Sequence, residues 1–117
     1  MNLEELADIL EATIHHGDDE ALNDEVSRVV ASDLMSDILA RDDTPDVLLT
    51  GLNTVQIVHT ASISGIKAVV IARGKTPLQS VVDRAVEENV VLMSTKIGMF
   101  EASGRLYAKG LYSSAAE

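Results

Sequence analysis

Hydroxyl, amide and charged side chains recur at four points of this chain, each directly after a short apolar run. Groups of these types can bind a phosphate or a carboxylate through hydrogen bonds and charge. The residues are Ser32 and Asp33; Asn53 and Thr54; Arg73, Lys75 and Thr76; and Ser94, Thr95 and Lys96. If the fold brings the four points together, they would form a site for a small anionic ligand, such as a nucleotide or another anionic metabolite.

The same residue types have a simpler role at the start of a helix. Ser, Thr, Asn and Asp accept hydrogen bonds from the free N–H groups of a first turn, and we weight this role above ligand binding. Thr76 before Pro77 is the strongest predicted helix start. Ligand binding stays in consideration because Arg73, Lys75 and Lys96 gather in a chain of net charge −10. The acidic surface of a neighbouring subunit is the alternative partner for these cations.

Sequence motifs of catalysis are incomplete. The run from Arg73 to Thr76 ends like a phosphate-binding P-loop, but Val69 stands where that loop requires its first glycine. His15 and His16 would point to opposite faces of a strand and could not chelate together. The chain has no cysteine and no G-x-S-x-G sequence. We therefore expect no enzyme, no metal and no cofactor, and a phosphotransfer accessory is the least favoured function.

Hydrophobic periodicity predicts the elements that would hold these residues. The expected helices span residues 3–11, 34–39, 55–64, 77–86 and 97–109, and the expected strands span residues 12–16, 26–31, 47–50, 66–72 and 90–93. From residue 47 onward, apolar strands alternate with helices, as in βαβ units. We predict an α/β fold with a small, mostly parallel sheet and helices on both faces. The carboxyl ends of parallel strands meet at one edge, so the four points would lie close together.

Length and composition exclude several classes of protein. The 117 residues suit one domain, predicted over residues 1–112, followed by a frayed tail over residues 113–117. Residues 1–50 carry fourteen acidic and two basic side chains (−12), and residues 51–117 carry five and seven (+2). This acidity disfavours nucleic acid and membrane surfaces as partners. The acidic start and the absence of cysteine and of long apolar runs favour a cytoplasmic protein.

The last predicted helix offers a second kind of surface. Phe100 and Tyr107 are two of the three aromatic residues of the chain, and Gly104 belongs to a patch of small residues between them. Packing of this helix in the core and a dimer contact through Phe100, Gly104 and Tyr107 carry equal weight.

Several of these stretches together resemble the DRTGG domain family over nearly the whole chain. The matching stretches are residues 31–37, 66–74, Pro77 with its following helix, 91–95 and 100–107. The resemblance implies a fold similar to the N-terminal domain of HPr kinase/phosphorylase and a non-catalytic, often dimerising, regulatory role. Members stand alone or beside CBS domains, and stand-alone members occur near iron-only hydrogenase genes.

This chain departs from the motif that gives the family its name. Where the family has Asp-Arg-Thr-Gly-Gly, the sequence reads Leu52, Asn53, Thr54, Val55 and Gln56. The leading hypothesis is a homodimeric regulatory domain that binds a small anionic ligand. The alternative is a protein-interaction module that docks a redox (hydrogenase-associated) or kinase partner without a small-molecule ligand.

Overall fold

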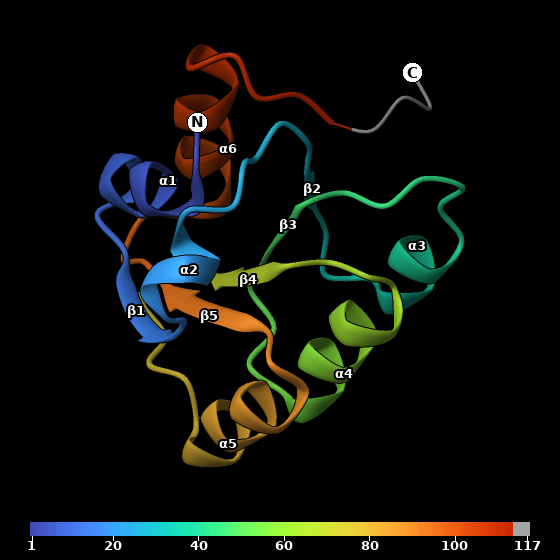
Figure 1. Cartoon of the computed structure of the whole chain (residues 1–117). Coiled ribbons are helices and arrows are strands. Elements are labelled where there is room, and N and C mark those ends of the chain that lie inside the picture. Colours follow the sequence, from blue (N-terminus) through green and yellow to red (C-terminus); the bar gives the residue numbers. More distant parts are fainter. Residues whose placement is uncertain (114–117) are drawn as a thin grey trace.

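The computed structural model describes residues 1–113 and contains a five-stranded sheet between two layers of helices (Figure 1). The strands lie in the order β1-β5-β4-β3-β2, and all neighbours are parallel except β1, which runs antiparallel to β5. Their bounds are Thr13–His16 (β1), Val29–Ala31 (β2), Val47–Thr50 (β3), Ala68–Ile71 (β4) and Val91–Ser94 (β5). The predicted α/β fold with a mostly parallel sheet is therefore confirmed. Of the predicted tail, only Ser113 lies within the described residues.

Helices cover both faces of this sheet. Their bounds are Leu3–Leu10 (α1), Asp19–Leu22 (α2), Met35–Leu39 (α3), Val55–Ile63 (α4), Gln79–Glu88 (α5) and Met99–Ala108 (α6). In Figure 1, α1 and α6 lie above the sheet, and α4 and α5 lie below it. Two hydrophobic clusters result, one on each face. None of the helices of residues 1–113 is long and apolar enough to cross a membrane.

The alternation of side chains along each strand assigns residues to the two clusters. In β3, Val47 and Leu49 join the cluster under α1 and α6, whereas Leu48 joins the cluster over α4 and α5. Both sides of β3 and β4 are buried, which explains why their sequences are apolar throughout rather than alternating. The buried hydrophobic residues are all aliphatic, and the three aromatic residues of the chain are exposed.

Helix starts are where the sequence-based boundaries differ most from the structure. Thr54 caps α4 as expected, accepting a hydrogen bond from the Ile57 N–H at 3.3 Å. The predicted start at Thr76 is wrong, because α5 begins at Gln79 and has no side-chain cap. Likewise α3 and α6 begin without side-chain caps, at residues 35 and 99. The short helix α2, capped by Asp18, lies between the expected strands 12–16 and 26–31, where the sequence predicted no element.

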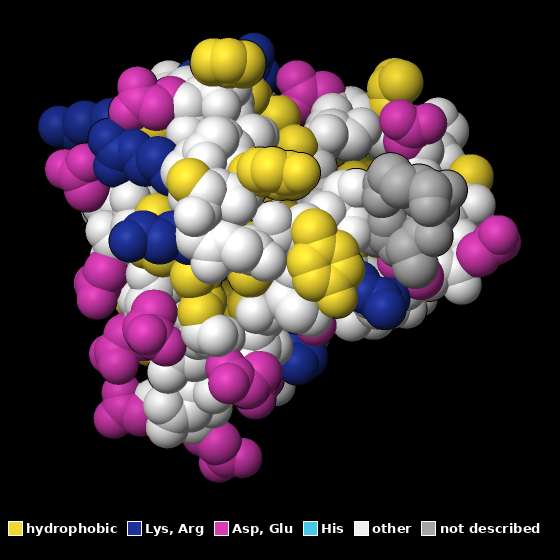
Figure 2. Space-filling view, turned by 90° about the horizontal axis from the view of Figure 1, so that it is seen from above, with side chains coloured by type: hydrophobic (Ala, Val, Ile, Leu, Met, Phe, Trp, Pro, Cys, Tyr) yellow, Lys and Arg dark blue, Asp and Glu magenta, His cyan; other side chains and the backbone are white. Residues whose placement is uncertain are grey.

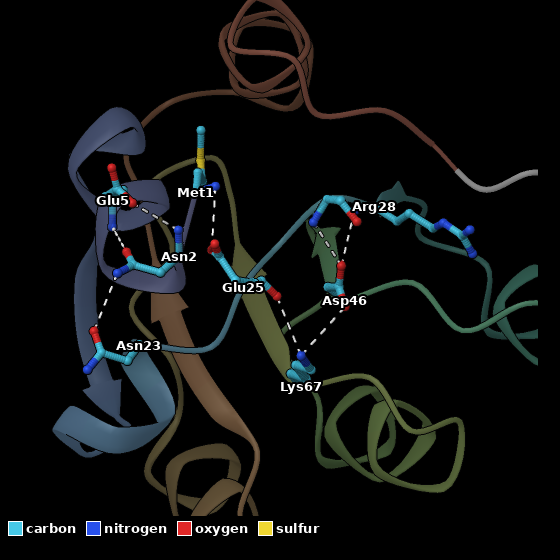
Figure 3. A network of polar contacts seen from close by, with 9 residues as sticks. Met1, Asn2, Glu5, Asn23, Glu25, Arg28, Asp46 and Lys67 are labelled. Carbon is cyan, nitrogen blue, oxygen red and sulfur yellow. Dashed lines mark hydrogen bonds and ion pairs between the residues drawn. The ribbon is translucent and has the colours of Figure 1, made fainter.

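Polar contacts hold the edge of the sheet where the parallel strands begin (Figure 3). Asp46, just before β3, accepts hydrogen bonds from the N–H groups of Ser27 and Arg28 at 2.9 and 3.1 Å. The ammonium group of Lys67, just before β4, lies 3.8 Å from the Asp46 carboxylate and 3.4 Å from the Glu25 carbonyl oxygen. These contacts join the starts of three strands, so polar groups at this edge are engaged within the chain.

Thr95 connects the layers at the opposite edge. Its side chain is 3% exposed, its hydroxyl donates to the carbonyl of Leu10 at 2.6 Å, and its oxygen accepts from the N–H of Ile97 at 3.1 Å. Leu10 ends α1 and Ile97 precedes α6, so one hydroxyl ties both helices of this layer to the end of β5.

Replacing Thr95 by Val should lower the free energy of unfolding by about 1–3 kcal/mol, because the Leu10 carbonyl loses its donor and the Ile97 N–H its acceptor. Thr95→Ser keeps the hydroxyl and should lose only about 1 kcal/mol for the missing methyl group. Urea denaturation followed by circular dichroism measures both. A smaller loss for Thr95→Val than for Thr95→Ser would show that the methyl group, rather than the hydroxyl, stabilises this junction.

Candidate functional site

The four polar loops predicted from the sequence lie at one edge of the sheet, where β2, β3, β4 and β5 end. Their residues divide into two groups. Ser32, Asp33, Asn53, Thr54 and Arg73 hold the loops together through contacts within the chain. Lys75, Thr76, Ser94, Thr95 and Lys96 line a groove beside β1.

Asp33 is the centre of the first group. One carboxylate oxygen accepts hydrogen bonds from the Thr50 hydroxyl at 2.9 Å and the Gly51 N–H at 2.7 Å, and the other lies 3.1 Å from the Arg73 guanidinium. The Gly51 N–H is the main cause that holds the pKa of Asp33 below its ordinary value; Thr50 and Arg73 add to it, and partial burial opposes it. A side chain at position 51 would meet the guanidinium of Arg73, so glycine permits this close approach.

Asn53 and Lys75 bind the loop after β3 to the loop after β4. The amide nitrogen of Asn53 donates to the Thr76 carbonyl at 3.0 Å, and its oxygen accepts from the Leu78 N–H at 3.2 Å. The Lys75 ammonium donates to the Gly51 carbonyl at 2.8 Å. Asn53 thus satisfies the backbone just before α5, which explains why Thr76 is not needed as a cap.

The turn after β4 has an unusual backbone that looks suited to anions. Arg73 and Gly74 both have left-handed dihedral angles, with φ of 70° and 77°. Successive N–H groups in such turns can form a concave anion site. Here the N–H of Arg73 donates to the Ile97 carbonyl and that of Gly74 to the Thr95 carbonyl, at 3.0 and 2.9 Å. These two amides therefore fasten the turn to the neighbouring loop and are not free for a ligand.

The groove of the second group has a volume of about 560 Å³. Its lining residues are Glu11, Thr13, His15, Gly74, Lys75, Thr76, Ser94, Thr95, Lys96 and Ile97. Within residues 1–113, the N–H groups of Lys75, Thr76 and Lys96 donate to no protein acceptor. Glu11 is paired with Arg105 at 2.9 Å, which offsets the acidic charge in the lining. Ammonium groups and free backbone N–H groups are donors of the kind that bind anions.

His15 is the residue of this groove that sequence analysis missed. Its Nε2 lies 2.7 Å from the hydroxyl oxygen of Ser94, and burial lowers the pKa of His15 below its ordinary value of 6.5. Ser94 and His15 are 79 residues apart, and only the antiparallel pairing of β1 with β5 brings them together. The sequence marked His15 as part of a strand, but no local signal identified its partner.

The contact between His15 and Ser94 can be compared with a catalytic pair. A serine and a histidine at this distance resemble a nucleophile and its base. However, no carboxylate of the described chain accepts a hydrogen bond from the other ring nitrogen of His15, and Glu11 is engaged with Arg105. Across residues 1–113, no group of three or more His, Cys, Asp or Glu side chains is placed to hold a metal ion.

Comparisons with known proteins agree with the fold. Residues 5–108 match the family model of the DRTGG domain. The chain belongs to the DRTGG domain family. Among curated proteins, none matches this chain.

A solved structure also resembles this DRTGG domain. It is the crystal structure of the CBS and DRTGG domains of the regulatory region of Clostridium perfringens pyrophosphatase, complexed with the activator diadenosine tetraphosphate. The TM-score is 0.72 at 19% sequence identity. The match covers 94% of this chain but 47% of that chain, so the present sequence spans about half of the pyrophosphatase region. At this identity, the likeness shows a shared fold.

Replacing Asp33 by Ala should lower the free energy of unfolding by about 1 kcal/mol at pH 6, because the buried Gly51 N–H loses its acceptor while the Arg73 pair is largely screened by solvent. The folded pKa of Asp33 is lowered, so its contribution is present above the unfolded value near 3.8 and is lost as the pH falls through the folded value. The difference between wild type and variant should therefore shrink from pH 6 to pH 2.5 in urea denaturation.

Asp42→Ala is the matched control. The exposed Asp42 carboxylate makes no hydrogen bond or ion pair with another described residue. Its replacement should leave stability within about 0.5 kcal/mol of wild type. A loss as large as that of Asp33→Ala would show that removal of any acidic residue from this half has the same effect, and would contradict a specific role of Asp33.

Proposed function

We propose that this DRTGG domain is a non-catalytic regulatory domain that senses a small anionic ligand, a nucleotide or another anionic metabolite, in the groove beside β1. The observation that carries the proposal is the pair of lysines, Lys75 and Lys96, on the rim of a groove in a chain of net charge −10. The proposed setting is the cytoplasm, as expected from the sequence.

The electrostatics of the edge support this site over the one first suggested by Arg73. Arg73 is 3.1 Å from Asp33, so its charge is already compensated within the chain. The ammonium group of Lys75 contacts a neutral carbonyl, and Lys96 makes no ion pair within residues 1–113. Their charges remain uncompensated, and a bound anion would compensate them. We therefore place the proposed ligand site in the groove alone, and not along the whole edge of the sheet.

The size and donors of the groove fit the same ligand class. Small-molecule sites commonly have volumes of roughly 300–1,000 Å³. The groove, at about 560 Å³, falls in this range, and its lining is rich in hydroxyl, ammonium and N–H donors. The pyrophosphatase region that shares this fold is complexed with a dinucleotide activator, which supports a nucleotide as one candidate ligand.

The homodimer is proposed on the outer face of α6. Phe100 is 94% exposed and Tyr107 is 75% exposed. The two residues are about two helical turns apart and therefore lie on the same face of α6. Gly104 lies between them, and a methyl group added there would meet no other part of residues 1–113 within 4 Å beyond its chain neighbours and the backbone of α6 itself. A mid-helix glycine costs about 1 kcal/mol relative to alanine. Because packing within the chain does not require this glycine, close approach of a second copy would explain it.

The surroundings of α6 also suit a self-complementary contact. A hollow of about 290 Å³ lies between β2 and α6, lined by Leu106, Tyr107, Leu111 and Tyr112 among others. In Figure 2, which views the molecule from above, hydrophobic side chains project in the middle of the face and acidic side chains lie mainly around its margin. A projecting aromatic group beside a hollow on one face allows each copy to fill the hollow of the other.

The competing function is a protein-interaction module without a small-molecule ligand. Asp18, Asp19 and Glu20 are exposed and form an acidic surface that a basic partner would match. Asp18 already caps α2, so part of this charge has a structural role. A redox or kinase partner would bind here independently of the groove, which makes the two functions separable by experiment.

The melting temperature of the purified protein should rise with ATP or inorganic pyrophosphate at constant ionic strength, because the ligand binds only the folded state. Lys75→Gln and Lys96→Gln should each weaken binding about tenfold or more, since a charged hydrogen bond contributes roughly 1.5–3 kcal/mol. Lys109→Gln removes the same charge outside the groove lining and should bind like wild type. No shift with any nucleotide or phosphorylated metabolite would contradict the proposal and favour the interaction module.

Light scattering should give the mass of a dimer, and the double variant Phe100→Ser, Tyr107→Ser should give that of a monomer at the same concentration. An aromatic anchor in an interface commonly contributes about 2 kcal/mol, so each replacement should raise the dissociation constant roughly 30-fold. Ile63→Ser is the control, because Ile63 is also exposed but lies on α4. A monomeric wild type, or dissociation by the control alone, would rule out this interface.

A further inference from the structure

We infer that the His15 and Ser94 pair binds the doubly charged head of the anion, a tetrahedral phosphoryl or sulfuryl group, and that His15 takes up a proton as the anion binds. This inference rests on the proposed anion groove and deepens it. It assigns a ligand class, and it gives a role to His15, whose side chain has no other hydrogen-bond partner within residues 1–113.

The position of His15 depends on an irregularity of the sheet. Ile14 pairs with Met93 and His16 with Leu92, so His15 is an extra residue in the ladder between β1 and β5. Extra residues of this kind change the direction of a side chain and are common beside functional sites. Here the imidazole reaches the hydroxyl of Ser94, the last residue of β5, at 2.7 Å. Both side chains belong to the groove lining.

The hydrogen bond between the two side chains couples the proton to the ligand. When His15 is neutral, either partner can donate, depending on the tautomer. When His15 is protonated, its Nε2–H must donate to the Ser94 oxygen, because an imidazolium ion has no acceptor. The Ser94 O–H is then free to donate to a third group. A ligand oxygen in the groove is such an acceptor, so the proton on His15 and the ligand stabilise each other.

Burial opposes protonation of His15 and lowers its pKa below the ordinary value. The two lysines of the lining, Lys75 and Lys96, offer no negative charge that would stabilise an imidazolium ion. The nearest acid of the lining, Glu11, is paired with Arg105. His16, the other titratable side chain of β1, follows the extra residue and is absent from the lining.

The helix α5 packs against β1 and carries further charged residues. None of its charged residues lines the groove within the described chain. Asp83 accepts a hydrogen bond from Gln79, and Arg84 pairs with Glu87 and Glu88 along the helix. A negative charge that would stabilise protonated His15 must therefore come from the ligand.

The number of charges selects the ligand class. A carboxylate has one negative charge and two oxygens, and the two lysines suffice to compensate it. A phosphoryl or sulfuryl dianion offers three or four oxygens. Its second negative charge favours a third cation, protonated His15, in addition to the two lysines. The groove should therefore bind sulfate and phosphate more tightly than acetate.

Isothermal titration calorimetry with inorganic sulfate tests the proton directly. Sulfate remains a dianion between pH 6 and 8, whereas phosphate monoesters titrate near pH 6 and would add protons of their own. Titrations at pH 7 in two buffers of different ionisation enthalpy give the number of protons taken up. We expect a fraction of one proton for wild type, and an affinity that rises as the pH falls from 8 to 6, by up to about tenfold per pH unit.

The variant His15→Gln separates this inference from the proposed function. It should take up no proton and show a flat affinity from pH 8 to 6, so its affinity should fall further below that of wild type as the pH decreases. A nuclear magnetic resonance titration of His15 in the unmodified protein should show a higher pKa with sulfate than without it. This second measurement does not depend on the folding of any variant.

The outcomes are distinct. If wild type and His15→Gln bind sulfate with equal affinity and equal proton uptake at every pH, the role of His15 is wrong while the anion groove stands. If acetate binds as tightly as sulfate, the assigned ligand class is wrong. If neither sulfate nor phosphate binds wild type, the groove itself is wrong, and this inference is overturned with it.

Discussion

The antiparallel pairing of β1 with β5 is the contact on which the candidate site depends. The four parallel strands would form a sheet without β1, but the groove would then have only one wall. Pairing places His15 against Ser94 and brings the end of α1 to the buried hydroxyl of Thr95. It therefore connects residues at the two ends of the chain. Such distant contacts carry a large loop-closure cost, so the hydrophobic cluster under α1 and α6 must stabilise them.

The ion pairs at this edge distinguish a cation with an acidic partner from cations without one. Arg73 has a rigid guanidinium that pairs with Asp33 and lies where a side chain at position 51 would be. Lys75 and Lys96 differ from Arg73, because their ammonium groups form no ion pair with an acidic side chain of the described residues. Arginine suits a fixed bridge between loops, and lysine is a compact charge on a flexible stem. At this edge Arg73 thus forms an ion pair between loops, whereas Lys75 contacts only a neutral carbonyl and Lys96 forms no ion pair among the described residues.

Sequence reasoning predicted the parallel βαβ units because their signals are local. The run from residue 47 to 50 is apolar and corresponds to β3 without any shift. It mispredicted the start of α5 because Asn53, from a different loop, satisfies the backbone before that helix. It gave His15 no role, because that role follows from an irregular pairing with a strand nearly 80 residues away. Local chemistry predicted the elements, whereas contacts between elements determined which polar residues are engaged and which line the groove.

The groove and the aromatic face of α6 are joined by one short loop, residues 95–98. Lys96 lines the groove, the carbonyls of Thr95 and Ile97 hold the turn after β4, and α6 begins at Met99. Arg105 of α6 also binds Glu11 at the groove margin. This loop therefore connects the groove to the start of α6. If the anion binds the dimer more tightly than the monomer, dimerisation must by reciprocity strengthen anion binding by the same factor.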